Sequence, residues 1–176
     1  MTDDELRAAL REHAYLEGDF VLRSGRRSRY YLDKYRFETR PELLRALGQR
    51  ITSAVREHEP DAVRLAGPEL GAVALTAAAS LESGLPFLIV RKDAKSYGTG
   101  NRLEGAFVPG ESVCLVEDVV TTGGAAISAV LALREAGLVC RTAISVVDRE
   151  EGGVDELARH AVRLRPLFTA SDVLSA

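Results

Sequence analysis

The sequence predicts an α/β fold in which a mainly parallel sheet is flanked by helices. From residue 62 onward, short apolar segments alternate with longer segments of helical character. The apolar segments are continuous, as in strands that are buried on both faces, and their alternation with helices favours parallel strands joined by right-handed crossovers. Ligands of such sheets bind beyond the carboxyl ends of the strands, so functional residues are expected there.

Before residue 62, the sequence predicts two helices separated by short strands. A capping box between Thr2 and Glu5 begins the first helix, and Gly18 is its expected end. Strand-like segments follow at residues 20–22 and 30–32. A second box, between Thr39 and Glu42 with a proline in the first turn, predicts the start of the second helix.

After residue 62, strands are predicted at 62–66, 86–90, 112–117 and 139–147, and helices at 71–83 and 124–137. Three strand ends, after Ala66, Val90 and Glu117, are therefore expected to lie close together. Residues beyond 153 show no clear pattern.

Length and composition suit one domain, and residues 1–176 are expected to form it. The chain is 46% hydrophobic and 28% charged, and 23 Lys and Arg against 26 Asp and Glu give a net charge of −3. This balance disfavours a globally basic nucleic-acid binder. The six basic residues between positions 23 and 36, interleaved with tyrosines, leave a local nucleic-acid stripe as an alternative.

No segment predicts membrane insertion or secretion, and a cytoplasmic location is expected. The longest strictly apolar run covers residues 129–133, far short of the ~20 residues that span a bilayer. Cys114 and Cys140 lie in strand-like runs and are expected to be core residues in a reducing compartment. The three histidines have no metal-ligand spacing, so a zinc site is not expected.

The segment 113–125 carries the most informative pattern. A buried strand ends in Glu117 and Asp118, and a loop of Thr and Gly then opens a helix. Free amides, hydroxyls and the helix dipole suit a phosphate monoester, and Gly123 and Gly124 allow close approach. The two acids need hydroxyl donors or a divalent metal, and a sugar phosphate offers both a diol and a phosphate. The alternative is a plain strand-to-helix turn.

A basic cluster at the preceding strand end suits a pyrophosphate group. Arg91, Lys92 and Lys95 lead into a long loop that contains Gly98, Gly100 and Gly105. Such a loop is typical of a mobile lid, and its cations suit clustered phosphate oxygens. The alternative is a solvated loop with incidental charges.

Residues 117–125 resemble the phosphoribosyl pyrophosphate (PRPP) binding motif of the type I phosphoribosyltransferases. Three further segments, 18–33, 91–105 and 146–149, are similar to the orotate phosphoribosyltransferases of that family, and the resemblance covers about residues 18–150. Tyr97 stands where the family usually has His, and Arg23 where it usually has Lys. Residues 67–71 correspond to its pyrophosphate loop but contain no lysine, so their amides would have to bind.

The resemblance implies a small N-terminal hood, mainly residues 1–38, and a flexible catalytic loop. It implies catalytic roles for Lys95, Glu117 and Asp118. It implies that PRPP is bound by Arg23, Arg91, Lys92, Lys95, Tyr97, Glu117, Asp118, Val119, Val120, Thr121, Thr122, Gly123, Gly124 and Ala125. It implies that orotate is bound by Tyr30, Tyr31, Thr121 and Arg149, the last pairing with the orotate carboxylate unless it forms only a surface ion pair.

The same resemblance implies the reaction and its partners. Orotate and PRPP would give orotidine 5-monophosphate and pyrophosphate in pyrimidine (UMP) biosynthesis, with Mg²⁺ held mainly by the pyrophosphate. A homodimer is expected, in which the catalytic loop acts on the partner's site. The alternatives are a phosphoribosyltransferase for a purine or uracil, and a PRPP-sensing regulator that binds nucleic acid.

Overall fold

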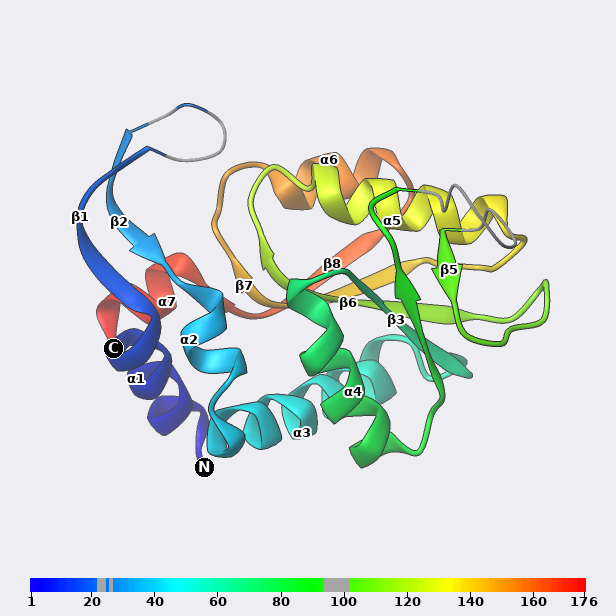
Figure 1. The fold of residues 1–176 in the computed structure, drawn as a ribbon, viewed down its shortest axis with the longest axis horizontal. Coiled ribbons are helices and arrows are strands. Elements are labelled where there is room, and N and C mark those ends of the chain that lie inside the picture. Colours follow the sequence, from blue (N-terminus) through cyan, green and yellow to red (C-terminus); the bar gives the residue numbers. More distant parts are fainter. Residues whose placement is uncertain (22–24, 26, 94–101) are drawn as a thin grey trace.

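The computed structural model describes residues 1–21, 25, 27–93 and 102–176, and it confirms the α/β fold. A six-stranded sheet has the order β5-β4-β3-β6-β7-β8 (Figure 1). Its neighbours pair in parallel except β4 and β5, which are antiparallel. The strands are β3 (Arg64–Pro68), β4 (Phe87–Val90), β5 (Leu103–Glu104), β6 (Val113–Val120), β7 (Thr142–Asp148) and β8 (Arg163–Thr169).

Helices cover both faces of this sheet, and the sheet separates the hydrophobic core into two clusters. On one face lie α3 (Pro41–His58) and α4 (Gly71–Ser83), with α1 (Asp3–Ala14) packed alongside (Figure 1). On the other lie α5 (Gly124–Glu135) and α6 (Gly153–Arg159). The remaining helices are short, α2 (Lys34–Glu38) and α7 (Ala170–Ser175). The central strand β6 is therefore buried from both sides, which explains its continuous apolar sequence.

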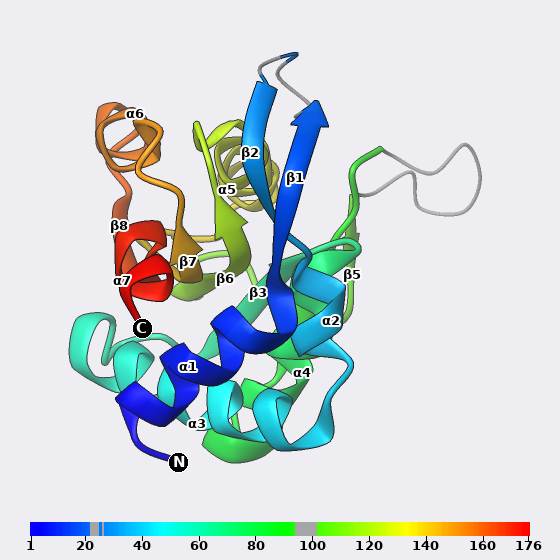
Figure 2. The same cartoon turned by 90° about the vertical axis from the view of Figure 1, so that its left-hand side faces the viewer.

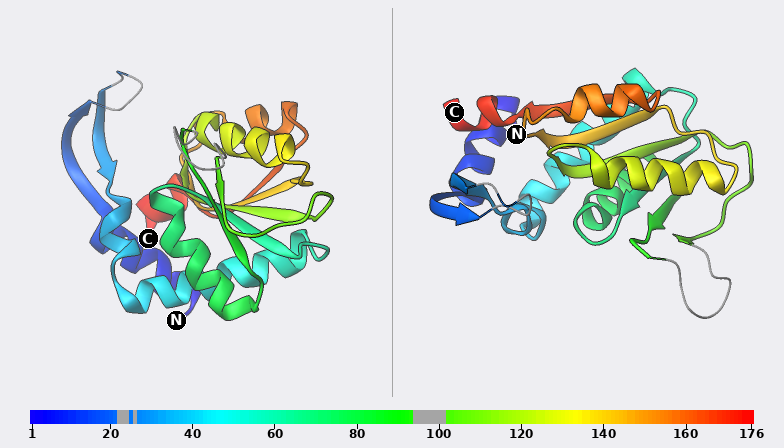
Figure 3. Two further views of the ribbon diagram at one scale, coloured as in Figure 1. Left: turned by 45° about the vertical axis from the view of Figure 1, so that its right-hand side comes forward. Right: turned by 90° about the horizontal axis from the view of Figure 1, so that it is seen from above.

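A separate two-stranded sheet forms the amino-terminal hairpin. Strands β1 (Tyr15–Val21) and β2 (Arg27–Leu32) pair antiparallel. The hairpin stands away from the main sheet, as Figures 2 and 3 show from two sides. The ring of Tyr15 stacks on that of Tyr30, with centroids 5.9 Å apart.

The first helix begins as predicted but ends earlier. Thr2 Oγ1 accepts from the Glu5 amide at 3.2 Å, and the Glu5 carboxylate accepts from the Thr2 amide at 2.7 Å. The predicted end at Gly18 is wrong, because α1 stops at Ala14 and Gly18 lies within β1. Pairing with β2 gives the backbone from Tyr15 onward partners that a longer helix would forgo.

The second predicted capping box is also wrong. Helix α3 starts at Pro41 with Arg40 as its N-cap and no side-chain cap. The Thr39 hydroxyl instead donates to the carbonyl of Tyr35 at 2.6 Å and closes α2. The short helix α2, which the sequence did not predict, therefore uses the residue expected to cap α3.

Most later elements match their predicted positions, and α4 has the predicted bounds. Strand β6 continues three residues past Glu117 because it pairs with β7 as far as Val120 and Asp148. Glu117 and Asp118 thus lie inside the strand. The region beyond residue 153, for which nothing was predicted, forms α6, β8 and α7.

Two expectations about environment can be compared with the structure. Cys114 and Cys140 are free thiols buried in the core, as predicted. Among the described residues, no helix combines the length and the apolar character needed to cross a bilayer.

Candidate active site

Two buried acids occupy the carboxyl-terminal half of β6. Glu117 and Asp118 are only 6% and 4% exposed, because β3 and β7 pair on either side of this strand. Asp118 Oδ1 accepts from the Val119 amide, and Oδ2 accepts from the ammonium of Lys34. Glu117 Oε1 has no hydrogen-bond partner among the described residues. Since buried polar groups are nearly always paired, this oxygen is available for a donor from a ligand.

Burial changes the protonation of the acids in this cluster. Desolvation, reinforced by the charge of Asp118, raises the pKa of Glu117 to about 8. Glu38 of α2, 4% exposed, has its pKa raised to about 8 by the same two causes. Perturbed carboxyls gathered at the end of a buried strand are typical of a functional site.

The loop after β6 leads into a helix start that is suited to an anion. Gly123, the N-cap of α5, has φ = 86°, a left-handed conformation that favours glycine, and no side chain caps this helix start. Thr121 and Thr122 are exposed, as are Gly124 and Ala125. A Cβ added at Gly124 would meet no protein atom within 4 Å, so the space beside it is open. An uncapped helix start with nearby hydroxyls can bind phosphate.

Neighbouring elements pack closely against the loop that follows β6. Val120 is 3% exposed, and its carbonyl accepts from the Arg149 amide at 2.8 Å, which ties the ends of β6 and β7 together. Val119 packs on the core beneath. A Cβ at Gly153 would lie 2.5 Å from Val120 Cγ1 and 2.7 Å from the Thr121 carbonyl oxygen, so only glycine allows this close packing.

The ends of β3 and β4 are joined beside the acids. Glu69 Oε1 accepts from the Lys92 amide at 2.8 Å, and the Glu69 amide donates to the Val90 carbonyl at 2.9 Å. Lys92 is exposed, and Arg91 is half-buried with its Nε unpaired within the described part of the chain. The Arg91 Nη1 atom lies 3.7 Å from the carboxylate of Glu104. These cations therefore lie where the sequence predicted them, next to the loop 94–101.

Three predicted ligand-binding residues, Arg23, Lys95 and Tyr97, lie outside the described residues. Arg102, which follows residues 94–101 in the chain, donates from Nη2 to Ser128 Oγ of α5 at 3.0 Å.

The amino-terminal hairpin meets the end of β7 through a cation–π contact. The guanidinium carbon of Arg149 lies 4.9 Å from the ring centroid of Tyr30. Arg149 is 9% exposed and its Nη2 lies 3.3 Å from the carboxylate of Glu151, whereas its Nε has no partner in the described structure. Tyr31 lies elsewhere, 40% exposed with its ring 5.6 Å from that of Phe20. The structure thus brings Tyr30 and Arg149 together but not Tyr31.

The sequence did not identify two residues of this region, Lys34 and Glu38. Both belong to α2, whose five residues are too few for a periodic hydrophobic pattern. Their i, i+4 spacing was the only signal, and it is common on solvated helices.

An uncapped helix start can bind a phosphate, buried acids can bind a diol, and clustered cations can bind a pyrophosphate. One substrate carries all three, so fold and site define a protein of the phosphoribosyltransferase class. No family model matches the chain, but curated relatives do. Orotate phosphoribosyltransferase of Halobacterium salinarum is 49% identical over 175 residues, 99% of this chain and 98% of its own length. That of Natronomonas pharaonis is 50% identical over 176 residues, 99% of each chain. The chain belongs to the orotate phosphoribosyltransferase family.

Solved structures agree with this assignment. Orotate phosphoribosyltransferase from Aeropyrum pernix superposes with a TM-score of 0.87 at 32% identity, covering 97% of this chain and 96% of its own. The Mycobacterium tuberculosis enzyme in complex with PRPP gives 0.82 at 27% identity, with 97% and 98% covered. An adenine phosphoribosyltransferase from Leishmania donovani gives 0.75 at 16% identity, a likeness of fold alone.

Proposed function

We propose that the protein transfers the phosphoribosyl group of PRPP to orotate, giving orotidine 5-monophosphate and pyrophosphate in pyrimidine biosynthesis. The observation that carries this proposal is the position of Arg149 next to the phosphate loop and against Tyr30. An arginine fork beside an aromatic ring suits a planar base that bears a carboxylate, which orotate has and purines and uracil lack.

The reaction forms a bond between orotate N1 and the anomeric carbon of the ribose, and breaks the bond from that carbon to pyrophosphate. In our proposal residues 121–125 hold the 5-phosphate, while Glu117 and Asp118 accept hydrogen bonds from the ribose hydroxyls. Positive charge develops on the sugar and negative charge on the leaving group. The protein's contribution is to orient both substrates and to stabilise these charges.

The leaving group would face the cations at the end of β4. Arg91 and Lys92 are placed for this role, and Lys95, Tyr97 and Arg23 are proposed to contribute from segments outside the described residues. In this proposal the catalytic loop at residues 95–105 closes over the site and excludes water, which would otherwise hydrolyse the activated sugar.

Mg²⁺ is proposed to arrive on the pyrophosphate of PRPP. The described residues contain no cluster of three or more His, Cys, Asp or Glu side chains that could hold a metal ion. In this proposal the ion is carried by the oxygens of the pyrophosphate. Bound there, it would neutralise charge on the leaving group.

The test is the loss of orotate ultraviolet absorbance after addition of PRPP and Mg²⁺, with adenine, guanine and uracil assayed in parallel. Turnover of orotate alone is expected. Turnover of a purine or uracil in its place would contradict the assignment of Arg149. Absence of all turnover, combined with salt-dependent binding of RNA or DNA, would favour a regulator.

We also propose a two-fold homodimer in which the catalytic loop acts on the partner's site. Lys95→Ala and Asp118→Asn should each be nearly inactive alone. In mixed dimers both lesions would fall on one site and leave the other whole. Random exchange of equal amounts makes about half of the dimers mixed, so roughly a quarter of wild-type activity should return. No recovery after verified subunit exchange would contradict action in trans.

A further inference from the structure

A lysine from the amino-terminal region forms an ion pair with a proposed substrate-binding acid. The Nζ atom of Lys34, in α2, donates to Asp118 Oδ2, in β6. The two side chains are 30% and 6% exposed, so the pair lies at the inner boundary of the site. Partial burial gives such a pair more weight than one on the surface.

The surrounding backbone is shaped around this pair. A Cβ added at Gly71, the first residue of α4, would lie 1.7 Å from Asp118 Oδ2 and 2.5 Å from Lys34 Nζ. Any other residue would therefore displace one or both groups. Three elements distant in sequence, α2, α4 and β6, meet at this point, which fixes the orientation of the carboxylate.

The groups that interact with this pair are mostly acidic. They are Tyr35 and Glu38 from α2 and Glu117 from β6, and Asp33, the N-cap of α2, acts in turn on Glu38. Burial alone would lower the pKa of Lys34, but the adjacent Asp118 raises it above its ordinary value, so the ammonium stays charged. Lys34 in turn lowers the pKa of both Glu38 and Glu117, opposing the effect of burial.

We propose that Lys34 is a positioning residue for PRPP, which orients the Asp118 carboxylate and balances its charge while that carboxylate accepts from a ribose hydroxyl. A carboxylate oxygen can accept more than one hydrogen bond, so Oδ2 can keep Lys34 and also accept from the sugar. Lys34 would therefore act through Asp118 and need not touch the base. This inference rests on the proposed function.

The experiment compares Lys34→Met, which keeps the length of the side chain but removes its charge, with Lys34→Arg, which keeps the charge. The matched control is Arg36→Met, which removes a cation from the same helix. The Arg36 side chain is 55% exposed and lies 3.5 Å from Asp33. For each variant, kcat/KM for PRPP and for orotate is measured across pH, and folding is checked by circular dichroism and thermal unfolding.

For Lys34→Met we expect kcat/KM for PRPP to fall on the order of 30-fold through a raised KM, with KM for orotate within about two-fold of wild type. The acid limb of the PRPP profile should move to higher pH, because Glu117 and Glu38 lose the cation that favours their ionised forms. Lys34→Arg should recover most of the loss, and Arg36→Met should behave as wild type.

For a folded Lys34→Met variant, two results would overturn the inference. One is a Lys34→Met variant with wild-type kinetics and an unmoved pH profile. The other is an equal loss for both substrates with an unmoved profile, which a merely structural role would give. If Lys34→Met does not fold, the inference would also be overturned by a folded Lys34→Arg variant whose kcat/KM for PRPP stays far below that of wild type. Wild-type protein that does not turn over orotate would instead contradict the proposed function, so the two failures can be told apart.

Discussion

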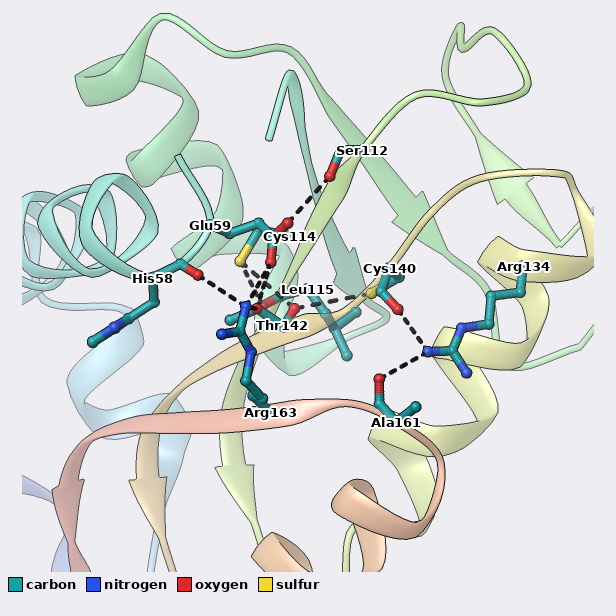
Figure 4. A network of polar contacts seen from close by, with 10 residues as sticks. All are labelled: His58, Glu59, Ser112, Cys114, Leu115, Arg134, Cys140, Thr142, Ala161 and Arg163. Carbon is teal, nitrogen blue, oxygen red and sulfur yellow. Dashed lines mark hydrogen bonds and ion pairs between the residues drawn. The ribbon is translucent and has the colours of Figure 1, made fainter. Parts of the chain in front are cut away.

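Two buried glutamates have very different surroundings. They lie at opposite edges of the sheet, one formed by the amino-terminal ends of its parallel strands and the other by their carboxyl-terminal ends. Glu59, which follows α3, is 5% exposed and accepts hydrogen bonds from Thr142 Oγ1 at 2.5 Å and Ser112 Oγ at 3.3 Å (Figure 4). Arg163 Nη2 lies 3.6 Å from the same carboxylate. Glu117, 6% exposed, has one oxygen without a partner among the described residues and a pKa raised to about 8.

The difference indicates that the residues that stabilise the fold and the residues that are available to a ligand lie at different edges of the same sheet. Around Glu59, at the amino-terminal edge of β6, β7 and β8, the protein supplies its own donors and a cation. At the carboxyl-terminal edge, atoms of Glu117 and Arg149 lack partners within the described structure. Such unpaired groups lower stability but are available to a ligand. We infer that the first edge is built for folding and the second for substrates.

The largest expected effect is on catalysis, from Asp118→Asn. Turnover should fall on the order of 10²-fold, about 2.7 kcal/mol of transition-state stabilisation, because the amide is a weaker acceptor for the ribose hydroxyl. Stability should change by only about 1 kcal/mol, since Lys34 is partly exposed and can be hydrated. Steady-state kinetics and urea unfolding measure the two quantities. A variant that unfolds instead would mean that Asp118 is chiefly structural.

The opposite edge should respond in the opposite way. Glu59→Gln should lower the free energy of unfolding by about 2 kcal/mol, because it weakens the contacts with Arg163 and Thr142. Activity per folded molecule should stay within about two-fold of wild type. A large loss of kcat in fully folded Glu59→Gln would show that the two edges are coupled and would contradict the comparison.

Arg149→Ala should raise KM for orotate about ten-fold and leave KM for PRPP nearly unchanged, since the proposed partner of this side chain is the orotate carboxylate. Varying each substrate at saturation of the other separates the two constants. Equal changes in both constants would mean that Arg149 does not read the base.

The last prediction concerns stability alone: the substitution is the same Glu-to-Gln change as at Glu59, but the expected effect has the opposite sign. The folded pKa of Glu117 lies above its unfolded value of 4.5, so the native state binds this proton more tightly. Its contribution to stability is therefore present below pH 4.5 and is lost as pH rises toward 8. Glu117→Gln should remove this loss and be more stable than wild type at pH 8.5, by up to about 4 kcal/mol, with little difference near pH 4.5. Parallel stability curves for the two proteins from pH 4.5 to 8.5 would contradict the assigned environment.

The sequence predicted the sheet and the strand ends because both depend on local patterns. Apolar runs and helix periodicity located β3, β4, β6, β7 and α4, and the acids and glycines after residue 116 led to the prediction of a phosphate-binding loop there. Strand β8 was missed for a physical reason. It is an edge strand, its exposed and buried residues are mixed, and it contains Pro166, which is tolerated only where a ladder hydrogen bond is not needed.

The rest of the site depends on contacts between distant segments. Lys34 and Asp118 are 84 positions apart, and neither a short polar helix nor a single lysine indicates that they meet. The same is true of Tyr30 and Arg149, whose contact depends on how the hairpin stands against the end of β7. Glu59 likewise showed no signal, because its partners come from the starts of three different strands.

The most direct test of the difference between the two edges is the stabilisation of wild type, Glu59→Gln and Asp118→Asn by PRPP with Mg²⁺. A ligand at 100 times its dissociation constant adds about 2.7 kcal/mol to the free energy of unfolding. At that PRPP concentration, Glu59→Gln should gain as much as wild type although it starts lower, and Asp118→Asn should gain little. A full gain in Asp118→Asn together with a lost gain in Glu59→Gln would contradict the assignment of the substrate site to the carboxyl-terminal edge.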